Sequence, residues 1–223
     1  MSTPKVVIER LPKYVQALAA LDMQERDVVS SQELADMLGA SHAQIRKDLS
    51  YFGRFGKQGR GYAVRTLLDE LRRILGLNRQ WRMALVGVGR LGQGILGYKG
   101  FASQGFRIVE AFDSNPELIG HPVDGLVIRD TADLEAILVI DPVDIGIVAV
   151  PAEAAQKVVD ALVNCGVRAI LNYAPIAAQV PEGVEVRRVD PVLALQEMTY
   201  YLKAGAALKT RAYKLTSHSP SAG

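Results

Sequence analysis

The sequence predicts an α/β protein with a small helical domain first and a Rossmann-type domain after it. Two observations predict this fold class. Residues 30–52 contain two helix-start signals separated by a short link, as in a helix-turn-helix. Residues 81–113 run in the order strand, glycine-rich loop, helix, strand and acid, which is the order of a dinucleotide-binding βαβ unit.

The composition is that of a folded protein. Of its 223 residues, 49% are hydrophobic and 22% are charged. No apolar run has the length of a membrane span and no signal-peptide core is visible, so we expect a cytoplasmic protein without membrane contact. The one cysteine, Cys165, excludes internal disulfides and cysteine-rich metal sites. Its apolar helical surroundings predict a buried, unreactive thiol, and we expect no bound metal.

The charge is unevenly distributed along the chain. Residues 1–79 carry 13 Lys or Arg and 9 Asp or Glu, whereas residues 80–223 carry 13 and 15. Six basic side chains and one acid, Asp48, fall within residues 46–65. A concentrated basic patch on the smaller domain would attract a phosphate backbone, although a solvated basic surface has the same composition.

Helical spacing of apolar residues predicts a first helix, with Pro4 in its first turn and a kink or second start at Pro12. The apolar positions are Val7, Ile8, Leu11, Val15, Leu18 and Leu21. Ser30 and Glu33 form a capping box for a helix over 31–38 that ends at Gly39. Ser41 and Gln44 form a second one for a helix that runs to about Phe52.

The second of these helices has the pattern of a DNA-recognition helix. Ile45, Leu49 and Phe52 recur at helical spacing and are expected to pack on the domain core. Polar side chains on the other faces can reach base edges and phosphates. The expected DNA contacts on this helix are Ser41, His42, Gln44, Arg46, Lys47, Ser50 and Tyr51.

A glycine-rich basic segment, residues 54–62, follows the recognition helix and predicts a β-hairpin wing. Lys57 and Arg60 in it are expected to contact DNA phosphates. A helical bundle for protein contacts is the alternative, but the capping boxes and the basic wing favour DNA. A helix over 67–75, with Thr66 as N-cap, then leads to a hinge over 76–80.

The cofactor site is predicted from the glycine loop and the acid that follows. The loop is Gly87, Val88, Gly89, Arg90, Leu91 and Gly92. It comes directly after the strand at 81–86 and should hold a pyrophosphate at the start of the next helix. Asp113 lies 21 residues beyond Gly92, after a strand over 106–112. Its carboxylate should bind the adenine ribose and repel a 2′-phosphate, which favours NADH and NAD⁺ over their phosphorylated forms.

Later βα units complete the domain. A buried strand over 144–150 ends at Pro151, a helix over 152–165 follows, and a strand over 168–171 leads into Asn172. Val150, Pro151 and Asn172 are expected beside the nicotinamide, because parallel strands bind ligands at their carboxyl ends. Pro191 should begin a last helix that reaches Leu208 or beyond. The excess of apolar residues on this helix suggests a dimer contact; they are Val192, Leu195, Met198, Tyr200, Tyr201 and Leu202.

The sequence offers no clear catalytic group. A dehydrogenase needs a proton donor or acceptor beside the nicotinamide, but His42 belongs to the helix-turn-helix, His121 to a loop and His218 to the tail. No tyrosine precedes a lysine by four residues, and little length remains for a substrate domain. We expect no catalysis. The alternatives are an NAD-dependent oxidoreductase with an N-terminal assembly domain, and a nucleotidyl- or acyl-CoA-binding module that leaves the basic wing unexplained.

Five segments, in this order, resemble the Rex family of redox-sensing transcriptional repressors. They are RKDLSYFG at 46–53, GVGRLG at 87–92, FDSNP at 112–116, VP at 150–151 and LNYAP at 171–175. The resemblance implies a homodimer that binds palindromic operator DNA when NAD⁺ is abundant and releases it when NADH accumulates. It also implies a winged helix-turn-helix over 1–78, a Rossmann domain over 79–190 and a domain-swapped helix over 191–215. The small, polar composition of residues 216–223 predicts a disordered tail.

The resemblance further implies an interdomain switch. Tyr98 and Asp190 match family positions in a polar cluster that links cofactor state to the DNA-binding domain. An arginine of the first helix usually completes that cluster, and this chain has Gln16 there. A hydrogen bond from Gln16 is expected to replace the ionic contact and to bias the switch more weakly.

Overall fold

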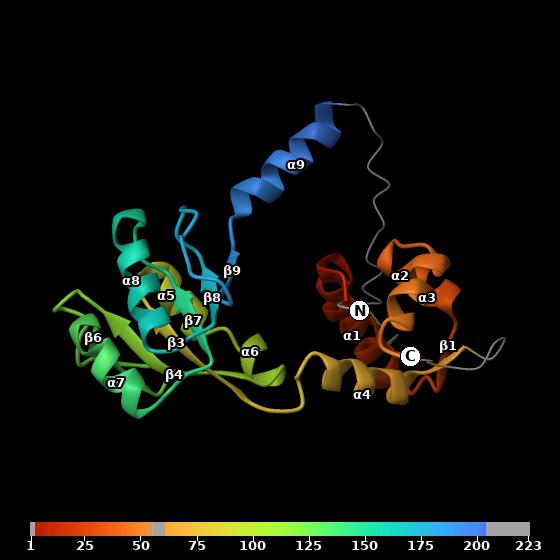
Figure 1. Ribbon diagram of the computed structural model, residues 1–223, viewed down its shortest axis with the longest axis horizontal. Helices are drawn as coiled ribbons and strands as arrows, with labels where there is room; N and C mark the ends of the chain where they lie inside the picture. The colour runs from red at the N-terminus through yellow and green to blue at the C-terminus, as the bar shows by residue number, and fades with distance from the viewer. Residues whose placement is uncertain (1–2, 54, 56–60, 204–223) are drawn as a thin grey trace, which may run out of the picture. The chain divides into compact units, whose positions relative to one another are not determined.

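The computed structural model describes residues 3–53, 55 and 61–203 (Figure 1). The chain divides into two compact units, each described by itself below. The first comprises Met1–Met83 and Ile95–Val109, and the second Ala84–Gly94 and Glu110 onward. The predicted wing residues Lys57 and Arg60, the end of the last helix beyond residue 203 and the tail lie outside the described residues.

Four helices and a two-stranded sheet form the N-terminal region (Figure 1). The helices are α1 (Lys5–Met23), α2 (Ser31–Leu38), α3 (His42–Ser50) and α4 (Val64–Ile74). Strand β1 (Val28–Val29) pairs antiparallel with β2 (Tyr62–Ala63). The helices enclose one apolar core, in which Leu11, Leu34 and Leu71 are fully buried.

Helix α1 runs without interruption through Pro12, so the expected second start is wrong. Pro12 lies on the exposed side of the helix, whereas Leu11 and Val15 on either side of it are buried. Packing of the buried side therefore holds both turns in one helix despite the hydrogen bond that the proline cannot donate.

The helix-turn-helix has the expected boundaries at its start. Ser30 and Glu33 make a complete capping box, and Gly39 ends α2 in the left-handed conformation with φ of 69°. The Ser41 hydroxyl accepts a hydrogen bond from the Gln44 backbone N–H at 3.2 Å. Helix α3 ends at Ser50, slightly before the expected Phe52.

The next helix begins earlier than the sequence predicts. Helix α4 starts at Val64 with Ala63 as its N-cap, so the assignment of Thr66 as N-cap is wrong. The Val64 N–H donates to the Asp27 carbonyl at 2.9 Å, and the Val64 side chain is fully buried. A tertiary contact thus supplies the partner that a capping side chain would otherwise provide.

Seven strands form the larger sheet, in the order β5-β6-β4-β3-β7-β8-β9. They are β3 (Trp81–Val86), β4 (Phe106–Asp113), β5 (Pro122–Val123), β6 (Leu126–Asp130), β7 (Ile145–Val148), β8 (Ala169–Asn172) and β9 (Glu185–Arg188). The short β5 pairs antiparallel with β6, whereas β6 with β4, β7 with β8 and β8 with β9 are parallel pairs. Without β5, the strand order is that of a dinucleotide-binding Rossmann sheet. From β3 the chain adds strands first toward one edge of the sheet (β4, β6) and then, from β7, toward the other edge (β8, β9).

Helices and short turns connect these strands. They are α5 (Arg90–Leu96), α6 (Gly100–Ser103), the 3₁₀ turn η1 (Thr131–Asp133), α7 (Leu134–Ile140), α8 (Ala152–Asn164) and α9 (Pro191–Lys203). Helices α7 and α8 pack together on one face of the sheet, where Leu138 and Val159 meet Val86 in the second apolar core (Figure 1). Helix α5 lies on the opposite face of the sheet. A Cβ at Gly92 of α5 would lie 3.6 Å from the Leu85 side chain, and Leu85 points to the face opposite to that of its neighbour Val86, because side chains alternate along a strand.

Cys165 caps the C-terminus of α8 and is half-buried. Burial and the nearby Glu135 carboxylate raise the pKa of its thiol.

Apolar side chains of α9 are exposed in the single chain, including Leu195 at 58% and Leu202 at 69%. Within the described ranges, no helix combines the length and apolarity needed to cross a bilayer.

Candidate nucleic-acid interface and nucleotide site

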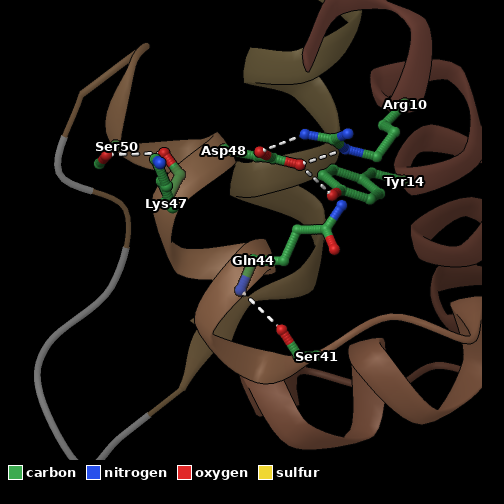
Figure 2. Close-up of polar contacts among 7 residues, drawn as sticks. All are labelled: Arg10, Tyr14, Ser41, Gln44, Lys47, Asp48 and Ser50. Carbon is green, nitrogen blue, oxygen red and sulfur yellow. Dashed lines mark hydrogen bonds and ion pairs between the residues drawn. The ribbon is translucent and has the colours of Figure 1, made fainter. Parts of the chain in front are cut away.

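Helix α3 separates its apolar and polar faces. Ile45 and Leu49 are buried in the N-terminal core, whereas Arg46, Lys47 and Ser50 are exposed together. The Ser50 hydroxyl donates to the Lys47 carbonyl at 2.7 Å (Figure 2). The exposed face therefore offers two cations and a hydroxyl that remains able to accept, which suits phosphates and base edges.

The other expected DNA contacts on this helix divide into two groups. Ser41 and Tyr51 are exposed at its two ends. His42 and Gln44 are half-buried instead, and both ring nitrogens of His42 are enclosed without a hydrogen-bond partner among the described residues. These two side chains are therefore less open to a DNA groove than their helical positions suggested.

Two of the three glycines in the loop after β3 are required by the geometry of the loop. Gly87 has φ of 97°, and a Cβ there would lie 2.5 Å from the Ala149 carbonyl oxygen. A Cβ on Gly92 would lie 2.0 Å from the Gly87 carbonyl oxygen. Gly89, in contrast, has nothing within 4 Å of its Cβ position and leaves open space beside the loop. This is the arrangement in which a glycine lets a pyrophosphate approach the backbone.

Asp113 lies at the carboxyl end of β4 and is already joined to the loop. Its Oδ2 accepts from the Val88 N–H at 2.6 Å, and its Oδ1 accepts from the Asn115 N–H at 2.8 Å. A carboxylate oxygen has more than one acceptor position, so both oxygens can still accept from ribose hydroxyls. Two backbone donors thus fix the orientation of the carboxylate before any ligand arrives.

The three residues expected beside a nicotinamide differ in accessibility. Val150 is half-buried and Pro151 is exposed, and both follow β7. Asn172 is fully buried: its Oδ1 accepts from the Ala174 N–H at 2.9 Å, and its Nδ2 donates to the Ile176 carbonyl at 3.3 Å. Its amide is therefore engaged in shaping the loop after β8.

The residues of the expected switch lie in separate elements. Gln16 is exposed on α1, and the Tyr98 ring packs edge-to-face on Phe101 with 5.0 Å between centroids. Asp190, just before α9, forms an ion pair with Arg188 and accepts from the Val192 N–H at 2.9 Å. Their joint action remains a prediction.

A buried polar cluster at α3 was missing from the sequence-based site. Asp48 is 2% exposed and accepts hydrogen bonds from Arg10 and Tyr14 of α1 (Figure 2). Burial raises the pKa of the Asp48 carboxyl, but the hydrogen bonds from Arg10 and Tyr14 outweigh it and the net shift is downward. The hydrogen bond to Asp48 raises the pKa of Arg10, and burial raises that of Tyr14. The one available signal was that Asp48 is the lone acid in a basic stretch.

Two family descriptions match separate parts of the chain. Residues 2–50 match a family described as "Putative DNA-binding protein N-terminus". Residues 78–176 match one described as "CoA binding domain". The first match ends at the last residue of α3, and the second covers β3 through β8 with the glycine loop and Asp113.

Curated relatives identify the family. The redox-sensing transcriptional repressor Rex of Roseiflexus sp. (strain RS-1) is 53% identical over 199 residues, which cover 89% of this chain and 90% of the relative. The chain belongs to the Rex family. The Rex protein of Streptomyces coelicolor is 45% identical over 198 residues, covering 89% of this chain and 77% of that protein. These Rex relatives are named as repressors and not as enzymes.

Solved structures of a Rex-family repressor, RSP, have the same fold. RSP in complex with β-NAD⁺ and operator DNA superposes with a TM-score of 0.87 at 36% identity, covering 92% of this chain and 94% of RSP. RSP in complex with β-NADH superposes with a TM-score of 0.84 at 34% identity, covering 92% and 96%. The expectations of a Rex-family repressor and a Rossmann-type α/β fold are thus confirmed.

Proposed function

We propose that this chain is a homodimeric transcriptional repressor that binds palindromic operator DNA and is released from it by NADH. Expression of its target genes then follows the ratio of NADH to NAD⁺. The protein acts in the cytoplasm, where both the cofactor pool and the DNA are found. The observation that carries the proposal is that one chain holds an exposed basic recognition helix and a preformed dinucleotide loop. The complexes of RSP with NAD⁺ and operator DNA, and with NADH, support it.

The nucleotide half of the cofactor binds at the carboxyl ends of β3 and β4. The open space at Gly89 admits the pyrophosphate, and the exposed Arg90 and Leu91 flank it. The Val88 N–H is occupied by Asp113, so Val88 contributes by orienting that carboxylate. Asp113 binds the ribose hydroxyls, and its negative charge disfavours a 2′-phosphate.

The nicotinamide half distinguishes the two redox forms by charge. NAD⁺ has a cationic ring and NADH a neutral one, and a water-excluded apolar surface disfavours the cation. Val150 and Pro151 form one wall, which a single chain leaves partly open. The exposed apolar side chains of the partner's α9 would cover it, which makes the dimer the sensing unit. Asn172 keeps the neighbouring loop in place.

The DNA contacts come from α3 and the wing. Arg46, Lys47 and Ser50 contact base edges and phosphates. Ser41 and Tyr51 contact the DNA at the two ends of the helix. Lys57 and Arg60 contact flanking phosphates. NADH binding moves the two recognition helices of the dimer out of register with successive major grooves, through Gln16, Tyr98 and Asp190.

The experiment that tests this function is an NADH titration of the operator-bound protein, followed by fluorescence anisotropy at fixed salt. Loss of the complex with NADH but not with the same concentration of NAD⁺ is the expected result. Release by NAD⁺ alone, or no response to either cofactor, would contradict the proposal. Turnover of an alcohol or carbonyl substrate without salt-dependent DNA binding would instead support an oxidoreductase.

A further inference from the structure

The buried face of α3 carries a carboxylate in a position where apolar packing would be expected. Asp48 lies one residue before the buried Leu49, and its side chain is turned toward α1 (Figure 2). A buried carboxylate is tolerated only when its oxygens are paired, because desolvation of an isolated charge is costly. The contacts of Asp48 therefore show what holds this face in place.

Three hydrogen bonds from α1 satisfy the Asp48 carboxylate. Arg10 donates from Nε to Oδ2 at 2.6 Å and from Nη2 to Oδ1 at 2.7 Å, and Tyr14 donates from its hydroxyl to Oδ2 at 2.5 Å. The pair of parallel bonds from one guanidinium fixes the plane of the carboxylate as well as its distance. The Arg10 side chain is 25% exposed and Asp48 is 2% exposed, so water competes weakly for these bonds.

Arg10 also determines the orientation of the Gln44 amide. The guanidinium has donors only, so the Gln44 oxygen must face it, which is the reverse of the amide orientation drawn in Figure 2. With the amide turned in this way, its oxygen lies 3.0 Å from Arg10 Nε and 3.3 Å from Nη1. Gln44 and Asp48 are four residues apart and lie on one side of α3. Arg10 therefore lies against two successive turns of this helix and is bonded to it at Asp48.

The contact of Arg10 with α3 lies beside the predicted DNA-contacting surface. Arg10, Gln44 and Asp48 line a groove of about 350 Å³ between the start of α1 and α3, together with Lys47 and Tyr51. Lys47 directly precedes Asp48, so a rotation of α3 that breaks the buried bonds also moves Lys47. Ile45 and Leu49 pack α3 on the apolar core, and the hydrogen bonds to Asp48 add a directional restraint that apolar contacts alone lack.

We infer that Arg10, Tyr14 and Asp48 form a positioning device that sets the rotation of the recognition helix on α1 and thereby its discrimination between operator and other DNA. The inference rests on the proposed function, since it assumes that α3 reads the operator. The three side chains do not themselves need to touch DNA. They act by fixing the exposed face of α3, because base readout tolerates little displacement of the contacting groups.

The decisive test replaces the cluster by apolar residues without changing the net charge. In the triple variant Arg10→Met/Tyr14→Phe/Asp48→Leu every polar group of the cluster is removed, and such replacements are often neutral or stabilising. We expect normal NADH binding and binding of non-operator DNA within about twofold of the wild type. Operator affinity should fall about 10- to 100-fold, so that discrimination is lost. A triple variant that discriminates as well as the wild type would overturn the inference.

A second variant keeps the test decisive if the triple variant folds poorly. Arg10→Lys retains the charge but cannot form two parallel bonds with the carboxylate. It should leave non-operator binding unchanged and lower operator affinity about 5-fold. If Arg10 acted only through its positive charge, Arg10→Lys would leave operator affinity unchanged. Full operator discrimination by Arg10→Lys would also overturn the inference.

The matched control removes another ion pair of the same unit. Arg73 and Glu70 of α4 are paired at 2.8 Å, with side chains 65% and 39% exposed. The double variant Glu70→Gln/Arg73→Gln preserves net charge and should bind operator like the wild type. Failure of the proposed function itself is recognised separately, because the wild type would then show no operator preference or no response to NADH.

Discussion

Each of the two units contains a carboxylate beside its predicted binding surface, and the two are held in different ways. Asp113 accepts from backbone N–H groups of its own loops, at Val88 and Asn115. Asp48 accepts from side chains of another helix, at Arg10 and Tyr14. Asp113 remains accessible to a ligand, whereas Asp48 is 2% exposed. Asp113, which is held by nearby backbone, is therefore suited to bind a ligand. Asp48, whose oxygens are bonded to side chains of another helix, is suited to position α3.

The largest effect should follow from removing the Asp48 carboxylate. Asp48→Ala leaves the Arg10 guanidinium without its partner and should lower the free energy of unfolding of the N-terminal unit by about 3 kcal/mol. Urea unfolding followed by circular dichroism measures this. The exposed pair of Asp22 and Arg65 provides the control, since Asp22→Ala should cost less than about 1 kcal/mol. Equal losses in both variants would remove the distinction drawn between Asp48 and a surface carboxylate.

Charge reversal on the exposed face of α3 should separate DNA binding from folding. Lys47→Glu should lower operator affinity about 100-fold, because each protomer of the dimer loses a cation near phosphate and gains an anion. Its NADH affinity should be unchanged. Anisotropy with labelled operator and a fluorescence titration with NADH measure the two quantities. Loss of both would indicate misfolding and not a DNA contact.

Removal of the Asp113 carboxylate should have the opposite pattern. Asp113→Ala loses charge-assisted bonds to ribose and should weaken NADH binding about 30-fold, or about 2 kcal/mol. Operator binding should persist and become insensitive to NADH. Asp160→Asn on α8, which removes an exposed carboxylate bonded to Gln156, is the control and should bind NADH normally. Unchanged NADH affinity in Asp113→Ala would show that the carboxylate serves only the loop.

Acid should weaken the N-terminal unit through Asp48. The pKa of its carboxyl is lower in the folded protein than in the unfolded chain, where it is about 4. Its stabilising contribution is therefore fully present above about pH 4 and is lost as the pH falls through the folded-state pKa. Unfolding measured between pH 7 and pH 2 should show a weaker acid dependence in Asp48→Asn than in the wild type. Parallel curves for the two proteins would contradict this assignment.

The smallest effect is expected at Cys165. Burial and Glu135 raise the pKa of its thiol, so little thiolate is present near neutral pH. Cys165→Ser should leave the NADH concentration for half-release of operator unchanged within about twofold, and the wild-type thiol should react slowly with iodoacetamide. A large change on substitution would mean that thiol chemistry contributes to redox sensing.

Much of the fold was predictable because its signals are local. The capping box at Ser30, the helix end at Gly39 and strand β3 were predicted at their observed positions. The glycine loop and Asp113 were recognisable because their spacing reflects one βαβ unit. Predictions that depended on tertiary contacts were less accurate. Helix α4 begins at Val64 because Asp27 accepts its N–H, and α1 continues through Pro12 because its other face is buried.

The sequence by itself determined the helix-turn-helix, the order of strand, loop, helix and strand around the nucleotide site, the glycines of the loop and the identity of the acid beside it. These features follow from backbone sterics and hydrogen bonding over short stretches. Only the tertiary structure revealed that Asp48 is joined to Arg10 and Tyr14, which lie 38 and 34 residues away. It also showed that Gln44 is turned toward Arg10. Such pairings depend on how one helix packs against another, and helical periodicity alone does not specify which polar side chains meet there.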